Sequence, residues 1–172
     1  MKLASLQTTA YRVLVPKWSH APTSGGGAGL HGGRVNRPGI DTLYLSLDTD
    51  TAIQEYQQTS SLLPPGTLVA YQIDLNPVVD FSAGFDATTW PALWEDFFCD
   101  WRECWFNRHV EPPSWVIGDE IIAAGAKGVL FPSAAKSGGF NLAVYTALLS
   151  ASDHVAAHDP GHSLPQDQSS WK

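Results

Sequence analysis

Three short motifs hold the residues of this chain that could do chemistry. Gly32-Gly33-Arg34 follows a glycine-rich run, Tyr44 and Ser46 lie in a predicted strand, and Glu55 falls one turn into the next predicted helix. A guanidinium can bind a diphosphate, an aromatic ring can stack on a nicotinamide, and a carboxylate can stabilise positive charge on a ribose. Together these groups predict a site that cleaves NAD+.

Each of these residues also has a purely structural interpretation. Arg34 could offer a bidentate fork to phosphate or ribose oxygens, or it could pair with a surface carboxylate. Tyr44 and Ser46 share one face of a strand, where a tyrosine is commonly part of the core. The helix N-terminus favours the ionised form of Glu55, which serves catalysis or helix stability equally well. Only the combination of the three favours a functional site.

Length and composition fit one globular domain. The chain has 172 residues, of which 44% are hydrophobic and 16% charged, enough to bury a core. Its net charge of −7 argues against a nucleic-acid partner or an anionic membrane surface. All 17 acidic residues lie at or beyond Asp41, whereas residues 1–40 contain five Lys or Arg residues. This asymmetry suits a small phosphate-bearing ligand, or it is chance on a solvated face.

Neither a metal site nor a membrane segment is expected. Cys99 and Cys104 have no second cysteine pair and no histidine cluster nearby, and His154, His158 and His162 lack an acidic or cysteine complement. No apolar run reaches the roughly 18 residues of a membrane span, and the N-terminus lacks a basic and hydrophobic leader. We therefore expect a reduced, cytoplasmic protein without a bound metal.

Hydrophobic periodicity and turn residues predict strands and helices that do not alternate strictly. Strands are expected at residues 8–15, 41–47, 67–75, 78–80, 128–131 and 142–149. Helices are expected after a cap at Asp48 or Thr49, and at residues 91–107 and 114–124. The predicted fold class is α+β, with one domain over residues 1–149 and a flexible tail over residues 150–172.

The glycine-rich run contains a motif that is misleading in this context. Residues 27–32 match the dinucleotide fingerprint G-x-G-x-x-G, which works only as a tight turn from a strand into a helix. Gly33, Asn36, Pro38 and Gly39 disfavour a following helix, and the preceding strand ends well before the motif. Residues 16–40 are therefore predicted to form a loop that lets the backbone approach a ligand, or merely a flexible surface loop.

Seven motifs occur in the order typical of one known family. They are Tyr11-Arg12; Gly32-Gly33-Arg34-Val35-Asn36-Arg37-Pro38-Gly39; Tyr44-Leu45-Ser46; Ala52-Ile53-Gln54-Glu55; Trp115-Val116-Ile117-Gly118; Gly128-Val129-Leu130-Phe131-Pro132-Ser133-Ala134; and Asn141-Leu142-Ala143-Val144-Tyr145. No single motif is specific, but seven in register over residues 8–148 are. The chain thus resembles the RES domain, the toxin of RES-Xre type bacterial toxin-antitoxin pairs.

The resemblance implies an ADP-ribosyltransferase-like fold, in which two small sheets and their helices surround an NAD cleft. It assigns catalytic roles to Arg34, Tyr44 and Glu55. The expected binding residues for NAD+, the implied substrate, are Arg12, Gly33, Arg34, Tyr44, Ser46, Ser133 and Asn141. His31 is not assigned a role, because in an extended chain it would point away from Arg34. The insertion at residues 18–29 is expected to alter the lid over the cofactor.

The implied reaction breaks the nicotinamide N-glycosidic bond through an oxocarbenium-like state. ADP-ribose would pass to a protein, such as an enzyme of phosphoribosyl pyrophosphate synthesis, or to water or phosphate, which would deplete NAD+. The implied partner is a cognate Xre-like antitoxin.

An aromatic series at helical spacing is interpreted as core, with an antitoxin surface or a homo-oligomer contact as the alternative. It consists of Trp90, Trp94, Phe97, Phe98, Trp101 and Trp105.

Two rival functions remain at this point. A non-catalytic nucleotide-binding module would use Arg34 and Tyr44 without needing Glu55. A glycosidase would need two carboxylates flanking a sugar cleft. Glu55 has no evident partner for that role, because Asp48 and Asp50 have the positions of helix-capping residues.

Overall fold

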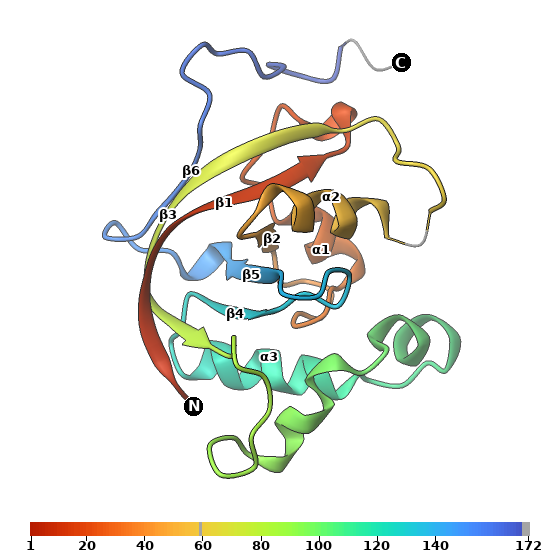
Figure 1. The fold of residues 1–172 in the computed structure, drawn as a ribbon, viewed down its shortest axis with the longest axis vertical. Helices are drawn as coiled ribbons and strands as arrows, with labels where there is room; N and C mark the ends of the chain where they lie inside the picture. The colour runs from red at the N-terminus through yellow and green to blue at the C-terminus, as the bar shows by residue number, and fades with distance from the viewer. Residues whose placement is uncertain (59, 170–172) are drawn as a thin grey trace.

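A single sheet organises the protein, which is described by a computed structural model over residues 1–58 and 60–169 (Figure 1). The mixture of strands and helices confirms the α+β class. In chain order the elements are β1 (Leu3–Leu14), η1 (Pro16–Trp18), α1 (Gly26–His31), β2 (Thr42–Ser46), α2 (Thr49–Gln57), β3 (Thr67–Asp80), η2 (Ala92–Phe98), η3 (Glu103–Asn107), α3 (Pro113–Ala123), β4 (Gly128–Pro132), β5 (Phe140–Tyr145), η4 (Thr146–Leu148) and β6 (His154–Ala157).

The strands follow the order β1-β2-β5-β4-β3-β6, and β1 also pairs with β3. β1 and β3 are long antiparallel partners that curve side by side round one flank of the molecule (Figure 1). In contrast, β1 meets β2 only at the pair Tyr11–Ser46, and β3 meets β4 only at Val79–Val129 and Asp80–Leu130. Because β1 also pairs with β3, the strands form a closed ring. The ring contains two extensively paired groups, β1-β3-β6 and β2-β5-β4, which are joined by the few residue pairs of β1–β2 and β3–β4.

The expectation of two separate small sheets is wrong in this respect. The groups β1-β3-β6 and β2-β5-β4 do exist, but backbone pairing joins them into one sheet. The reason is the length of β1 and β3, since a strand of 12 or 14 residues can curve far enough to pair with both groups.

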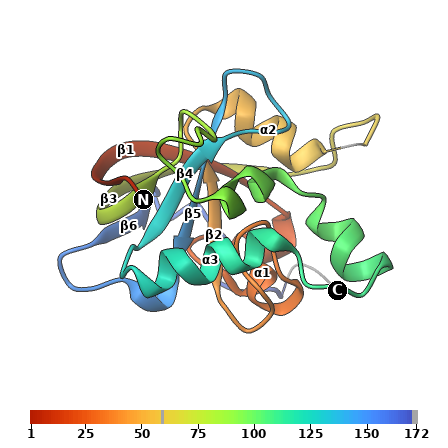
Figure 2. The same cartoon turned by 90° about the horizontal axis from the view of Figure 1, so that it is seen from below.

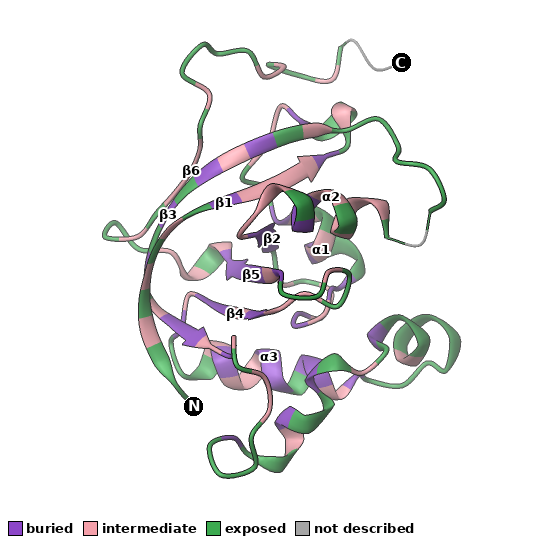
Figure 3. Ribbon diagram, in the orientation of Figure 1, coloured by how far each residue is buried: buried purple, intermediate pink, exposed green. Residues whose placement is uncertain are grey.

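Alternate residues of β5 pack into two different cores. Leu142 and Val144 join the apolar side chains of β1, β2 and β3, whereas Ala143 and Tyr145 join α3 and the aromatic side chains before it. Figure 3 shows the buried residues concentrated on the central strands and on α3. In Figure 2, α2 lies near the loop between β4 and β5, and α3 lies farther from that loop. Asn141 shares its face of β5 with Ala143 and Tyr145, so the contact with α2 and the packing against α3 use the same face of this strand.

Residues 90–111, here called the aromatic segment, do not form the single helix predicted at residues 91–107. A 3-10 helix ends at Phe98, Cys99 is extended with ψ of 152°, and Glu103–Asn107 forms a π-helical turn. The core interpretation is correct for the buried members of the series, Trp90, Trp94, Phe97 and Trp101. Phe98 and Trp105 remain 41% and 36% exposed.

Three other local predictions need correction. Residues 16–40 are not all loop, because the glycine run itself forms α1. β3 continues through Pro77 instead of breaking into two strands, since the Pro77 position needs no N–H donor in the pairing with β1. β5 ends at Tyr145, and the residues up to Leu148 turn as a 3-10 helix.

The predicted flexible tail contains regular structure. His154–Ala157 forms β6, which pairs antiparallel with residues 71–74 of β3. Residues 150–169 are rich in polar side chains, but an edge strand needs mainly backbone hydrogen bonds, and those do not appear in a hydrophobic pattern. Of the predicted tail, residues 170–172 lie outside the described residues.

Candidate functional site

One cleft of about 1130 Å³ brings the predicted site residues together. Its walls come from β1, the loop after α1, β2, α2, β5 and the aromatic segment. The predicted residues that line it are Arg12, Gly33, Arg34, Tyr44, Ser46, Glu55 and Asn141. Ser133 lies behind this surface and donates a hydrogen bond of 2.7 Å to Glu55 Oε1. Residues that are far apart in the sequence, from β1 to β5, thus contribute to one site.

Arg34 is held by the aromatic segment. Its Nη1 donates hydrogen bonds of 3.2 Å to the carbonyl oxygens of Phe97 and Cys99, and its Cζ lies 5.3 Å from the centroid of the Phe98 ring. Burial lowers the pKa of Arg34, yet a guanidinium remains charged in proteins. The other guanidinium N–H groups make no hydrogen bond to a described residue, so they are available to an anion in the cleft.

Tyr44 joins the glycine loop to β2. Its hydroxyl accepts a hydrogen bond of 3.0 Å from the backbone N–H of Val35 and donates one of 2.8 Å to Asn36 Oδ1. Burial raises the pKa of Tyr44, so the phenol stays protonated and can donate. The hydroxyl is therefore occupied in shaping the loop, and the ring is the part of Tyr44 that can contact a ligand.

Side chains of α3 and β5 hold the loop that carries Arg34. Trp115 Nε1 donates a hydrogen bond of 2.7 Å to the Gly33 carbonyl, and the Tyr145 hydroxyl donates one of 2.8 Å to the Val35 carbonyl. At Gly118, a Cβ atom would lie 2.1 Å from the Val35 oxygen, so only glycine allows α3 to approach this closely. These contacts give physical roles to motifs that the sequence identified without explaining.

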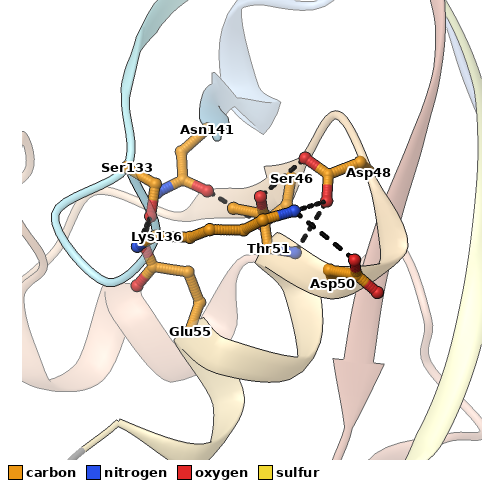
Figure 4. Close-up of polar contacts among 8 residues, drawn as sticks. All are labelled: Ser46, Asp48, Asp50, Thr51, Glu55, Ser133, Lys136 and Asn141. Atoms are coloured by element: carbon orange, nitrogen blue, oxygen red, sulfur yellow. Dashed lines mark hydrogen bonds and ion pairs between the residues drawn. The ribbon is translucent and has the colours of Figure 1, made fainter. Parts of the chain in front are cut away.

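Glu55 lies in a network of neutral polar side chains (Figure 4). Ser133 and Asn141 both donate to Oε1, over 2.7 and 2.5 Å, and Ser46 orients Asn141 by a hydrogen bond of 2.8 Å to Oδ1. No described residue donates a hydrogen bond to Glu55 Oε2. One carboxylate oxygen is therefore fixed and the other is free to face a ligand.

The charge of the cleft favours an anion. Arg12, Arg34 and Arg102 line it, whereas Glu55 is the single carboxylate among the lining residues that the structure describes. Arg12 is held by a hydrogen bond of 3.1 Å to the carbonyl of Ser24, and burial lowers its pKa. The Arg102 guanidinium lies 4.6 Å from the Trp101 ring centroid.

Some lining residues were not predicted from the sequence. Trp101, Arg102 and Phe106 reach the cleft from the aromatic segment, and all three follow its break after Phe98. His31 also lines the cleft, at an exposed position. The argument against His31 assumed an extended chain, whereas residues 26–31 are helical. No local pattern in the sequence would have identified the three aromatic-segment residues.

The described residues form neither a metal site nor a membrane-spanning helix. Within residues 1–58 and 60–169, no group of three or more His, Cys, Asp or Glu side chains is arranged to hold a metal ion. Cys99 and Cys104 are both free thiols. Over the same ranges, no helix has the length and apolar character needed to cross a membrane.

Comparison with known proteins identifies the family. The sequence matches the family model of the RES domain over residues 9–167. This protein belongs to the RES domain family. Its fold is similar to a chain in the crystal structure of the M. tuberculosis MbcT-MbcA toxin-antitoxin complex, with a TM-score of 0.60 and 19% identity. That match covers 91% of this RES protein and 84% of the other chain. No curated protein matches the sequence.

Proposed function

We propose that this RES protein is the toxin of a bacterial toxin-antitoxin pair and that it binds NAD+ in the cleft, cleaves the nicotinamide glycosidic bond and transfers ADP-ribose to a protein. The acceptor is expected to be an enzyme of phosphoribosyl pyrophosphate or nucleotide synthesis, as the family resemblance implies. The partner is a cognate Xre-like antitoxin, and the site of action is the cytoplasm. Membership of the RES family and the fold shared with a chain of a toxin-antitoxin complex support this proposal.

The observation that carries the proposal is the arrangement of Arg34 and Glu55 in one cleft. Arg34 presents N–H groups, and Glu55 presents the oxygen Oε2, that make no hydrogen bond to any described residue, while Glu55 Oε1 is held by Ser133 and Asn141. Arg12 and Arg102 add positive charge. The diphosphate of NAD+ is negatively charged and suits the Arg34 guanidinium. Its ribose becomes positively charged on cleavage and suits the Glu55 carboxylate.

The chemical step follows from these positions. Nicotinamide leaves with the electron pair of the C–N glycosidic bond, and positive charge develops on the ribose ring. The Glu55 carboxylate stabilises that charge, and the acceptor then adds its nucleophilic atom to the same ribose carbon and loses its proton. Arg34 and Arg12 hold the diphosphate and ribose, and the Tyr44 ring positions the nicotinamide. Ser133, which the family resemblance assigned to NAD+ binding, lies behind the cleft surface and orients Glu55 instead.

The test is to incubate the purified protein with NAD+, alone and with a cell lysate. Free nicotinamide and ADP-ribose-labelled protein are measured in parallel. Glu55→Gln serves as the control, because it keeps the size and the hydrogen-bonding atom of the side chain but removes its charge. A transferase gives labelled protein with the wild type and none with Glu55→Gln.

The other outcomes separate the alternatives. Nicotinamide release without labelled protein would mean that water or phosphate is the acceptor and that the toxin depletes NAD+. If NAD+ binds to the wild type and to Glu55→Gln equally, without nicotinamide release from either, the protein is a non-catalytic nucleotide-binding module and the proposed reaction is wrong.

A further inference from the structure

Lys136 connects the loop between β4 and β5 to the beginning of α2. Its Nζ lies 2.9 Å from Asp48 Oδ1 and 3.6 Å from Asp50 Oδ2 (Figure 4). Asp48 is also the N-cap of α2, since its Oδ1 accepts a hydrogen bond of 2.8 Å from the Thr51 backbone N–H. The ammonium group thus bonds directly to the residue that starts the helix carrying Glu55.

The same loop holds the serine that contacts Glu55. Ser133 Oγ accepts hydrogen bonds of 3.1 Å from the backbone N–H groups of Ala135 and Lys136 while donating to Glu55 Oε1. The loop closes through a 2.8 Å hydrogen bond from the Ser133 N–H to the Gly139 carbonyl. The direction of the Ser133 hydroxyl is therefore coupled to the position of the Lys136 backbone.

A second contact brings the loop and the helix close together. A Cβ atom at Gly139 would lie 2.2 Å from Thr51 Oγ1, so the loop backbone lies directly against the first turn of α2. Lys136 and Gly139 thus contact the same helical turn, one by charge and one by close packing. Their shared contact fixes the loop relative to Glu55, which lies one turn further along α2.

We propose that Lys136 is a positioning residue, which uses its ion pair with Asp48 to hold the Ser133 hydroxyl on Glu55 Oε1 so that Oε2 faces the substrate. This inference rests on the proposed function, because the orientation of Oε2 affects the reaction rate only if positive charge develops beside it on the ribose. Lys136 does not line the cleft. It acts on the reaction only through Ser133 and Glu55.

The main test compares Lys136→Met with Lys136→Arg by steady-state kinetics of nicotinamide release. Methionine keeps the aliphatic stem but removes the charge. We expect kcat to fall roughly 10-fold with KM nearly unchanged, because the interaction affects charge that develops only in the transition state and small misplacements are costly. Lys136→Arg should recover most of the loss, since arginine can still pair with Asp48.

Two further variants test the path of the effect. Asp48→Asn keeps a good helix cap but loses the ion pair, so it should lower kcat as Lys136→Met does. The double variant should be no slower than either single variant, because both remove the same interaction. Lys2→Met is the matched control, since it breaks another lysine-aspartate pair, with Asp80, away from the cleft. Its kcat should equal that of the wild type.

Amide hydrogen exchange gives a readout that does not need activity. In Lys136→Met the backbone N–H groups of Ala135 and of residue 136 should exchange faster, because the loop loses its attachment, while the Thr51 N–H stays protected by Asp48. Unchanged exchange in the loop, or a wild-type kcat in Lys136→Met, would overturn the proposed positioning role. If the wild type releases no nicotinamide, the proposed function fails, and hydrogen exchange alone decides whether Lys136 holds the loop.

Discussion

The two charged groups of the cleft are held in opposite ways. Arg34 contacts backbone carbonyls and an aromatic ring, and the loop that carries it is supported by buried Trp115 and Tyr145. We call this the arginine wall. Glu55 is held by polar side chains, and a half-buried ion pair lies behind them. We call this second group, Glu55 with Ser46, Ser133, Asn141 and the Lys136–Asp48 pair, the glutamate wall.

The two kinds of partner explain how each charged group stays available to a ligand. A buried cation needs acceptors, and carbonyl oxygens supply them without adding a negative charge that would compete with the ligand. A carboxylate needs donors, and neutral hydroxyl and amide groups leave its charge intact for the reaction. The arginine wall therefore depends on packing, whereas the glutamate wall depends on individual polar groups.

The largest expected effect is a failure of packing in the arginine wall. Gly118→Ala places a methyl group where the Val35 carbonyl lies, 2.1 Å from the new Cβ, and both partners are on rigid backbone. We expect the free energy of unfolding to fall by about 3 kcal/mol. Urea denaturation measures this, with Gly27→Ala as control, because a Cβ at Gly27 meets nothing within 4 Å. Equal stability of the two variants would show that packing here is adaptable.

Arg34→Lys tests whether the arginine wall needs the guanidinium itself. Lysine keeps the charge but cannot contact two carbonyls and still offer a fork to the ligand. We expect kcat/KM for nicotinamide release to fall roughly 100-fold, the value of a lost charged contact in a desolvated site. Arg37→Lys, in the ion pairs with Glu111 and Asp119 outside the cleft, should leave the rate unchanged. Full activity of Arg34→Lys would mean that charge alone suffices.

The glutamate wall should respond to loss of single hydrogen bonds. Asn141→Ala and Ser133→Ala each remove a donor to Glu55 Oε1, and we expect each to lower kcat roughly 10-fold. In the double variant, kcat should fall by less than the product of the two single fold-changes, because both groups orient the same oxygen. Strict additivity in steady-state assays would indicate that they act independently and would weaken the idea of one shared network.

The smallest expected effect is a dependence of stability on acid in the glutamate wall. The hydrogen bond from the Thr51 side chain, helped by Lys136, lowers the pKa of Asp48 from 3.8 to about 2. Because the folded pKa is the lower one, ionised Asp48 stabilises the fold above pH 4, and this contribution is lost as the pH falls towards 2.

The stability of the wild type should therefore exceed that of Asp48→Asn near neutral pH and approach it near pH 2. The difference should stay below about 1 kcal/mol, because solvent screens a side chain that is 43% exposed. Chemical denaturation over this pH range measures it. A constant difference between the two proteins would show that the Asp48 charge does not contribute.

Much of the glutamate wall could be predicted from local sequence. Asp48 has a capping position before an apolar helix pattern, and its carboxylate does accept from the Thr51 N–H. The strand alternation correctly placed Tyr44 and Ser46 on one face, and both line the cleft. The motifs that resemble the RES family added Ser133 and Asn141. These features depend on neighbours close in the chain or on a family pattern.

The residues of the arginine wall stand in the family motifs, but the contacts that hold Arg34 could not be predicted. Arg34 contacts carbonyls 63 and 65 residues away, and any residue type supplies a carbonyl, so the sequence shows no sign of the contact. The helix α1 forms from glycines, which are poor helix formers. Their small size is used elsewhere, because a Cβ at Gly25 or Gly29 would collide with Thr42 or Asp41. Tertiary packing therefore overrides helix propensity in α1.

The strand order also has a consequence for synthesis of the protein. β5 lies between β2 and β4 in the sheet, although it is the fifth strand in the chain. Both neighbours are left without this partner, and Glu55 without Asn141, until residues 140–145 have left the ribosome. A nascent or truncated chain that ends before β5 therefore contains Arg34, Tyr44 and Glu55 but no finished cleft. A cell that makes this protein therefore meets the assembled site only after translation has passed β5.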